Sequence, residues 1–181
     1  MKVKLARVNT LLLIAILLVN AYVMLLPAVP AVSFWLRTRS ASAETALANR
    51  IHTPATTTTP TYKENRLVVP AMLLDEPVYD GKDARTLNKG LWRRPDTSTP
   101  DKGGNTVISA HRFTYTVRHG MFYYLDKVQV GDELAVFWNG KRYLYRVNAT
   151  KVVPATATEV EAPTDKPVSY THLTLPTKLE V

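Results

Sequence analysis

Two short strand-like runs joined by Asn139-Gly140 restrict the fold of this chain more than any other segment. Residues 134–138 and 141–147 are rich in β-branched, aromatic and other apolar side chains. An Asn-Gly pair between two such runs is typical of a type I′ hairpin, because both loop residues adopt a positive φ. The pattern predicts an antiparallel hairpin in which Tyr143 and Tyr145 share one face. We expect that face to point into the core.

A second strand is predicted over residues 106–109, where polar and apolar residues alternate directly after a glycine pair. His111 follows at the end of this strand. An imidazole at a strand end is oriented by the sheet and still open to solvent, which suits a general acid or base. A single strand-end histidine is more often structural than catalytic, so His111 is a candidate only because of the sequence around it.

Further short elements surround this strand. Trp92 is expected to be a core aromatic residue, and the polar residues 93–102 a surface loop. The other predicted elements are short strands at 67–70, 71–74 and 151–153, a turn at 80–81 and a helical turn or two over 83–89. Short strands with close turns and little helix predict a mostly β domain, either an antiparallel barrel or a sandwich.

Several sequence blocks, taken in order, resemble the middle of a sortase, a member of the cell-wall and pilin cysteine transpeptidase family. The blocks are residues 87–92, 98–100, 104–112, 122–126, 130–134, 141–147 and 152–154. The resemblance covers about residues 67–168. It implies a closed antiparallel β-barrel with short helices, which agrees with the strand pattern.

The resemblance also implies a reaction. In the family, a cysteine thiolate attacks the Thr–Gly carbonyl of a Leu-Pro-x-Thr-Gly sorting signal, and an amine of the cell wall or a pilin resolves the acyl-enzyme. His111 is the residue carried over to this chain, as the general acid and base. The family arginine that donates to the oxyanion has no assigned position here. The implied partners are the sorting-signal peptide and the amine acceptor, and no cofactor is expected.

The nucleophile of this chemistry is missing, because the chain contains no cysteine. The family cysteine closes a Thr-Leu-x-Thr-Cys motif. Residues 174–178 read Thr-Leu-Pro-Thr-Lys, so Lys178 occupies the cysteine position, or the cysteine is lost after Val168. A lysine amine is protonated at neutral pH unless it is deeply desolvated, and it cannot replace the thiol unaided. This chain is therefore expected to be inactive.

Two explanations compete for residues 169–181. The tail is native, and the chain is a catalytically inactive, membrane-tethered binding domain; or the tail is foreign, from a frame error, a truncated gene or a cloning scar. The family-like pattern runs to Pro167-Val168, which favours a foreign tail. In that case His172 has no role, and the last strands of the barrel are missing. Open sheet edges and an incomplete core would follow.

The N-terminus predicts a membrane anchor over residues 1–36. Three basic residues within the first seven precede an apolar run from Leu11 to about Val32, in which Asn20 is the strongly polar interruption. About 20 residues cross a bilayer core, and the basic flank predicts a cytoplasmic N-terminus. We expect a single-pass protein of the cell membrane with its C-terminal domain outside the cytoplasm. A cleaved signal peptide is the alternative, because residues 28–32 are small.

Residues 37–64 are rich in Ser, Thr, Pro and Ala and predict a linker with one short helix at 43–51; the folded domain is expected over 65–168. His52, inside this linker, is given no role. His119 does not form a predicted metal site with His111, since neither a His-x-x-x-His spacing nor a carboxylate cluster accompanies them. The net charge of +8 is not concentrated in a basic helix or stripe, so no nucleic-acid partner is expected.

Overall fold

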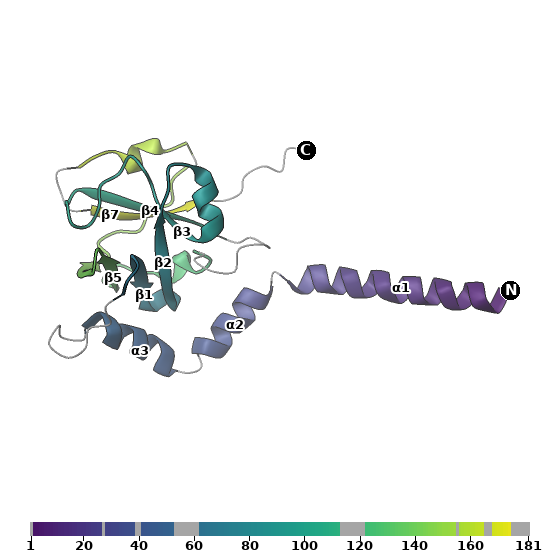
Figure 1. Cartoon of the computed structure of the whole chain (residues 1–181). Coiled ribbons are helices and arrows are strands. Elements are labelled where there is room, and N and C mark those ends of the chain that lie inside the picture. The colour runs from purple at the N-terminus through teal and green to yellow at the C-terminus, as the bar shows by residue number, and fades with distance from the viewer. Residues whose placement is uncertain are drawn as a thin grey trace. The chain divides into compact units, whose positions relative to one another are not determined.

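The computed structural model of the chain describes residues 2–26, 28–38, 41–52, 62–112, 122–154, 156–164 and 168–174. The chain divides into two compact units, Met1–Ala41 and Ser42–Val181. Figure 1 shows helices in the first unit and a curled sheet in the second. Each unit is described by itself below.

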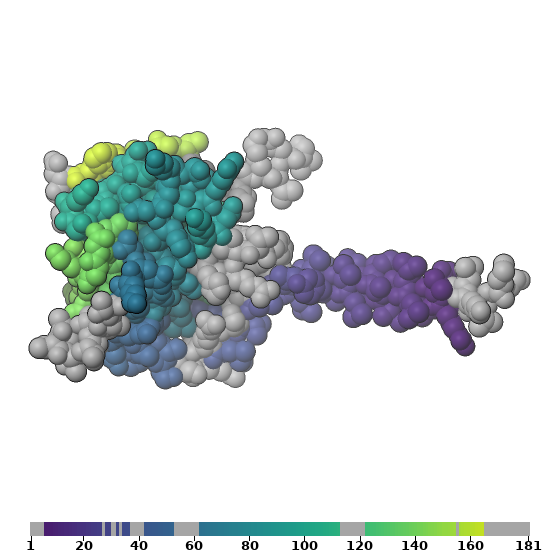
Figure 2. Space-filling view, in the orientation of Figure 1, coloured from purple at the N-terminus to yellow at the C-terminus, as the bar shows by residue number. Residues whose placement is uncertain are grey.

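The first unit holds α1 (Lys2–Leu25) and α2 (Ala28–Thr38). Residues Ala6–Leu25 of α1 have a mean hydropathy of 2.3 and form the one helix in the described chain that is long and apolar enough to cross a membrane. Its apolar side chains are exposed, as the purple segment of Figure 2 shows. The apolar run predicted from Leu11 to about Val32 is thus split into two helices, and the sequence places Pro27, which lacks a backbone N–H, between them.

The second unit contains a sheet of seven strands in the order β6-β5-β1-β2-β3-β4-β7. The strands are β1 (Arg66–Val69), β2 (Leu74–Asp80), β3 (Leu91–Arg93), β4 (Asn105–His111), β5 (Glu133–Trp138), β6 (Lys141–Arg146) and β7 (Val168–Thr174). The pairs β2–β3 and β4–β7 are parallel, and the other pairs are antiparallel.

The expected closed antiparallel barrel therefore needs correction. The sheet is mixed, and in the described residues β6 and β7 are the two ends of the strand order. The parallel pairs join strands that are not connected by tight turns: the 3₁₀ helix η2 (Ala84–Lys89) lies between β2 and β3, and β7 follows β4 only after β5 and β6. Hairpin signals in the sequence report antiparallel neighbours only, which explains the error.

The hairpin prediction is confirmed. Strands β5 and β6 pair in register from Glu133–Arg146 to Trp138–Lys141, which leaves a two-residue loop. In that loop Asn139 has a φ of 51° and Gly140 a φ of 74°, as a type I′ turn requires. Tyr143 and Tyr145 are partly buried and pack against the core, as expected from their shared face.

Two predicted strands are wrong. Residues 71–74 do not form a separate strand: Pro70–Met72 is a 3₁₀ turn, Leu73 has a φ of 52°, and β2 begins at Leu74. Residues 151–153 lie outside the strands, and the side chain of Val152 is fully exposed at 100%. Residues 71–74 are apolar but contain neither β-branched nor aromatic residues, and Pro70 starts a tight turn there. Residues 151–153 have β-prone composition without a neighbour in the described sheet to pair with.

The main core lies on one face of the sheet. Its buried members come from strands β1 to β5, from the 3₁₀ turn Pro70–Met72 and from the segment that follows residue 121; they are Leu67, Val69, Met72, Leu74, Val78, Leu91, Ile108, Ala110, Phe122, Val136 and Trp138. Trp92 is 2% exposed, and its Nε1 donates to the carbonyl of Gly81 at 2.8 Å. The prediction of a core tryptophan at position 92 is confirmed.

The helix α3 (Ala41–His52) packs on the sheet, although its residues were expected to belong to the linker of residues 37–64. Ile51 is 1% exposed and contacts a second buried cluster with Val68, Ala135 and Phe137. Leu47 lies one helical turn earlier and packs against the same cluster. These two apolar residues, four positions apart, dock the helix on the sheet. The average composition of residues 37–64 is that of a linker and does not indicate this docking.

Charged contacts reinforce the docking of α3. His52, for which no role was expected, places Nε2 2.7 Å from Oε2 of Glu133, and Arg146 places Nη2 2.7 Å from Oε1 of the same carboxylate. Arg50 pairs with Asp75 on β2. The carboxylate of Glu133 therefore joins α3 to the β5–β6 hairpin.

These contacts predict a pH-dependent contribution to stability. The hydrogen bond from Arg146, assisted by the charge of His52, lowers the pKa of Glu133 below its ordinary value of 4.5. A lowered carboxyl pKa stabilises the fold above pH 4.5, and this contribution is lost as the pH falls through the lower pKa of the folded state. We expect Glu133→Gln to lower the melting temperature at about pH 6, and the difference from the unmodified protein to shrink as the pH falls below 4.5. Thermal melts across this range test it; Glu159→Gln, at an exposed carboxylate, is the control.

Candidate active site

His111 is the last residue of β4 and is partly exposed, as the sequence predicted for its position. Ile108 and Ala110 belong to the main core, so alternation along the strand places His111 on the opposite face. Ser109 shares that face but is only 1% exposed. The strand thus emerges from a buried environment and presents its final side chain at the edge of the fold.

Strand β7 ends beside His111. It runs parallel to β4 with seven paired positions, from Asn105–Val168 to His111–Thr174. Figure 1 shows β7 next to β4. Because parallel strands point the same way, both finish at one edge of the sheet. His172 pairs with Ser109 within this ladder. Lys178 and His119 lie outside the described residues.

The end of β4 is held by Phe122. The amide of Phe122 donates to the carbonyl of His111 at 2.9 Å, and its ring, with 0% exposure, belongs to the main core. Two residues later, burial raises the pKa of Tyr124 to about 12, and the ring of Tyr124 meets that of Tyr123 edge to face at 4.8 Å. Tyr124 therefore stays protonated at neutral pH and does not act as a base.

The opposite end of β4 is covered by the segment 156–164, which includes the 3₁₀ helix η4 (Thr158–Glu161). The side-chain nitrogen Nδ2 of Asn105 donates to the carbonyls of Val160 at 3.0 Å and Ala162 at 2.9 Å. Arg94 donates to Glu161 at 3.0 Å and lies 4.5 Å from the ring centre of Trp92. These contacts hold the segment over the beginning of the strand whose end carries His111.

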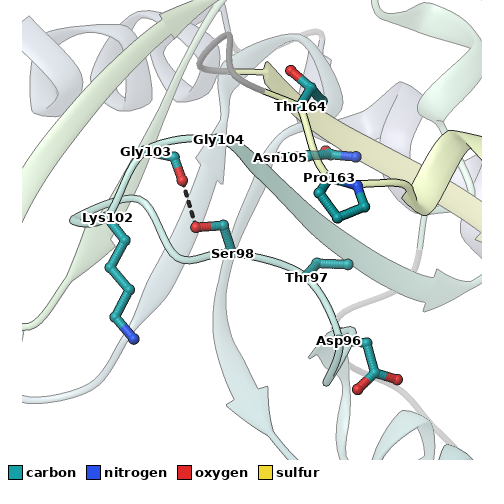
Figure 3. A pocket seen from close by; sticks show the side chains of 9 residues that line it. All are labelled: Asp96, Thr97, Ser98, Lys102, Gly103, Gly104, Asn105, Pro163 and Thr164. Carbon is teal, nitrogen blue, oxygen red and sulfur yellow. Dashed lines mark hydrogen bonds between the residues drawn. The ribbon is translucent and has the colours of Figure 1, made fainter.

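A cavity of about 330 Å³ lies at the beginning of β4 and is separate from His111. Its lining comes from the loop before β4 and from the segment 156–164: Asp96, Thr97, Ser98, Lys102, Gly103, Gly104, Asn105, Pro163 and Thr164. Figure 3 shows the hydroxyl of Ser98 directed to the carbonyl of Gly103, which closes the loop. Six steps of about 3.3 Å along β4 put this cavity about 20 Å from His111.

Glycine is required at position 104 of this loop. Gly104 has a φ of +75°, and a Cβ there would lie 3.1 Å from the carbonyl oxygen of Thr164. Neither the left-handed backbone nor the close approach suits another residue. The Gly-Asn pair at 104–105 thus fixes the start of β4 and its contact with the segment 156–164.

The described residues do not complete a nucleophilic site. The chain contains no cysteine. The hydroxyl of Ser109, two residues before His111, is buried and cannot reach a substrate. Within the described ranges, no group of three or more His, Asp and Glu side chains could hold a metal ion. At this edge the described residues offer a partly exposed imidazole, that of His111, and no accessible nucleophile beside it.

The sequence of this chain matches a known protein family and a curated relative. Residues 67–177 match the family model described as the Sortase domain. A curated relative, Sortase D of Bacillus subtilis (strain 168), is 30% identical over 94 residues, which are 52% of this chain and 44% of the relative. The chain thus spans less than half the length of that relative.

Solved structures show the same fold. The chain superimposes on sortase C-1 from Actinomyces oris with a TM-score of 0.54 and 27% identity, covering 64% of this chain and 66% of that one. A lid mutant of sortase C1 from Streptococcus agalactiae gives a TM-score of 0.54 at 22% identity, covering 79% of this chain and 82% of the other. The mixed, curled sheet is therefore a known architecture.

Proposed function

This chain belongs to the sortase family, and we propose that it is a membrane-anchored, extracytoplasmic transpeptidase. Its substrate would be a Leu-Pro-x-Thr-Gly-like sorting signal, which it joins to an amine of the cell wall or a pilin. The observation that carries the proposal is the family match over residues 67–177, which includes His111 at the end of β4.

In this reaction His111 moves protons. A cysteine thiolate adds to the threonine carbonyl, the tetrahedral adduct collapses to a thioester, and the departing glycine amine takes a proton from the imidazolium of His111. An acceptor amine then attacks the thioester and gives its proton back to the imidazole, while the thiolate leaves. A partly exposed imidazole at a fixed strand end is suited to both steps, because it is oriented and remains accessible to each amine.

We place the missing thiol a few residues beyond the end of the strand that pairs with β4. Seven paired positions show that β4 takes a parallel neighbour along its whole length. A cysteine shortly after the end of such a strand would lie at the same edge of the sheet as His111. Lys178 cannot perform its role, and we propose that residues 169–181 are foreign to the native protein. Residues 169–174 of β7 and the end of the family match, up to residue 177, lie within this tail, so a native strand would take the place of β7 beside β4.

The membrane anchor is proposed on the basis of α1. Its 20 residues Ala6–Leu25 extend about 30 Å at about 1.5 Å per residue, which matches the thickness of a bilayer core. Lys2 and Lys4 precede this stretch and place the N-terminus on the cytoplasmic side by the positive-inside rule. The sheet domain would then face the cell envelope.

The alternative function is a catalytically inactive, membrane-tethered sortase-like domain that binds a peptide or a wall polymer. The absence of cysteine from the sequence favours it. In this alternative, the sheet edge at His111 would hold a sorting signal without cleaving it.

A labelled Leu-Pro-x-Thr-Gly peptide, offered with an amine acceptor, tests the two functions. For the protein read from the native gene, we expect a thioester adduct and a transferred product by mass spectrometry. For the present chain we expect neither product. Saturable binding of the intact peptide by both proteins, without an adduct, would favour the inactive domain. Absence of both binding and cleavage in proteins with a folded circular dichroism spectrum would contradict both proposals.

A further inference from the structure

We propose that α2 lies in the lipid headgroup region of the membrane, with its apolar face against the acyl chains, and does not continue the span of α1. We define the apolar face of α2 as Val29, Val32, Trp35 and Leu36, whose side chains are 59%, 54%, 51% and 56% exposed. The inference rests on the proposal that α1 crosses the membrane.

Helix α1 is long enough to cross without α2. Its 20-residue apolar stretch ends at Leu25, and about 30 Å of helix already fills the bilayer core. Exposed apolar side chains occur at consecutive positions and so surround the helix; they are Leu11, Leu12, Leu13, Ile14, Ile16, Leu17, Leu18 and Val19. A helix that is apolar on all sides suits the hydrocarbon interior.

The chain turns between the two helices. The amide of Leu26 donates to the carbonyl of Tyr22 at 3.0 Å, and the amide of Val29 donates to the carbonyl of Leu26 at 3.2 Å. The second bond spans three residues, which is tighter than the four-residue step of an α-helix. The α-helical hydrogen-bond pattern of α1 is therefore interrupted before α2 begins.

The pattern of α2 differs from that of α1. Val29, Val32 and Leu36 are spaced at i, i+3 and i+7, which puts them on one side of the helix, and Trp35 follows Val32 by three residues. On the helical wheel, Arg37 and the partly buried Phe34 fall on the other side, whereas Ser33 lies beside Val29 and Leu36 at the border of the apolar face. An exposed apolar face that ends at an arginine, on a short helix separated from the spanning stretch, favours a position along the interface over a place in the span.

The chemistry of this face favours lipid over a protein partner. Tryptophan is enriched at the headgroup level of membranes, because its ring is apolar and its N–H is polar. Arg37 and Arg39 come directly after the face in the sequence, and arginine near the surface is attracted to anionic lipids. Four side chains on an 11-residue helix offer much less than the roughly 800 Å² per partner of a stable protein interface.

Tryptophan fluorescence of the full chain can locate this face. The chain has three tryptophans, and Trp92 and Trp138 are only 2% and 3% exposed, so Trp35 is the one that lipid can quench readily. The protein is reconstituted in vesicles of phosphatidylcholine and phosphatidylglycerol, with bromine on the lipid tails either near the headgroups or near the bilayer centre. The Trp35→Phe variant supplies the signal of the other two tryptophans.

We expect bromine near the headgroups to quench Trp35 about twofold or more better than bromine at the centre, with weak quenching by aqueous iodide. Val32→Asp with Leu36→Asp should reduce the lipid quenching to nearly the Trp35→Phe level. Ser42→Asp with Ala46→Asp is the matched control: it adds the same charge at the same spacing on exposed positions of α3, and should change nothing.

Each other outcome overturns the inference. Stronger quenching from the bilayer centre would make α2 part of the span, strong iodide quenching would place it in water, and protection from both quenchers would mean that protein covers it. Extraction with alkaline carbonate separates the two proposals. Release of the chain from the vesicles would remove the spanning role of α1 and, with it, this inference. If the chain stays in the vesicles but lipid does not quench Trp35, the inference about α2 is overturned and the spanning role of α1 stands.

Discussion

Replacing His111 with alanine is expected to slow sorting-signal cleavage by about 10²–10⁴-fold in the cysteine-containing form of the protein, because general acid–base catalysis commonly contributes that much. The fold should be nearly unaffected. His111 is partly exposed at the end of β4 and is not a member of either core cluster, so its removal leaves the packing in place. Single-turnover cleavage of a labelled peptide and a thermal melt measure the two effects.

The neighbouring Arg112 provides the matched control. It is exposed and follows His111 directly, so Arg112→Ala changes the same edge of the sheet without removing the imidazole. We expect Arg112→Ala to retain cleavage within about threefold of the unmodified enzyme, since an exposed side chain contributes little to packing. Normal cleavage by His111→Ala, with an unchanged melting temperature, would remove His111 from the mechanism.

Replacing Phe122 with alanine is expected to destabilise the domain by about 3–5 kcal/mol, the usual cost of removing a buried phenylalanine. The ring of Phe122 is 0% exposed and packs in the main core, and its backbone amide holds the carbonyl of His111. The loss is large compared with the roughly 5–15 kcal/mol that stabilises a typical domain. Urea unfolding measures the change in the free energy of unfolding.

Phe122→Leu is the graded control, because leucine keeps an apolar side chain at the position and leaves a smaller cavity. Its loss of stability should lie between zero and that of Phe122→Ala. A change below about 1 kcal/mol for Phe122→Ala would be typical of a surface site, and would contradict the position of this ring in the core.

Local chemistry explains which elements could be predicted from the sequence. The Asn139-Gly140 turn carries its own backbone requirement, and the hairpin formed there as expected. The strand ending at His111 follows from the β-branched run Thr106-Val107-Ile108 and from the glycine turn before it. Trp92 is a large aromatic residue beside a glycine break, and it is buried. In each case, residues within one short segment determine the outcome.

Elements that depend on distant partners could not be predicted in this way. The parallel pairing of β4 with β7 joins segments about 60 residues apart, and neither segment carries a signal for the other. Residues 151–153 resemble a strand but lack a neighbour in the described sheet. The docking of α3 depends on Ile51 meeting Phe137, far along the chain, inside a segment whose average composition is that of a linker.

The candidate site shows the same division. His111 was found from its place at a strand end and from the sequence blocks around it. The supports of the site were missed: Phe122 at the end of β4, and Asn105 with Arg94 at its beginning. Asn105 carried a usable signal, since it follows Gly104 at the start of a buried strand, where a polar side chain needs a hydrogen-bond partner. Arg94 and Glu161 carried none, because they meet only in the fold.

The most direct test of the central claim is the sequence of the source gene from the codon for Lys151 to its stop codon. The claim is that this protein is a cysteine transpeptidase of the sortase family whose nucleophile and oxyanion arginine are absent from the present chain. We predict a frame that continues after Val168 into a Thr-Leu-x-Thr-Cys strand and a later arginine. A gene that encodes Lys178 and stops after Val181 would contradict it and leave a domain that can bind a sorting signal without cleaving it.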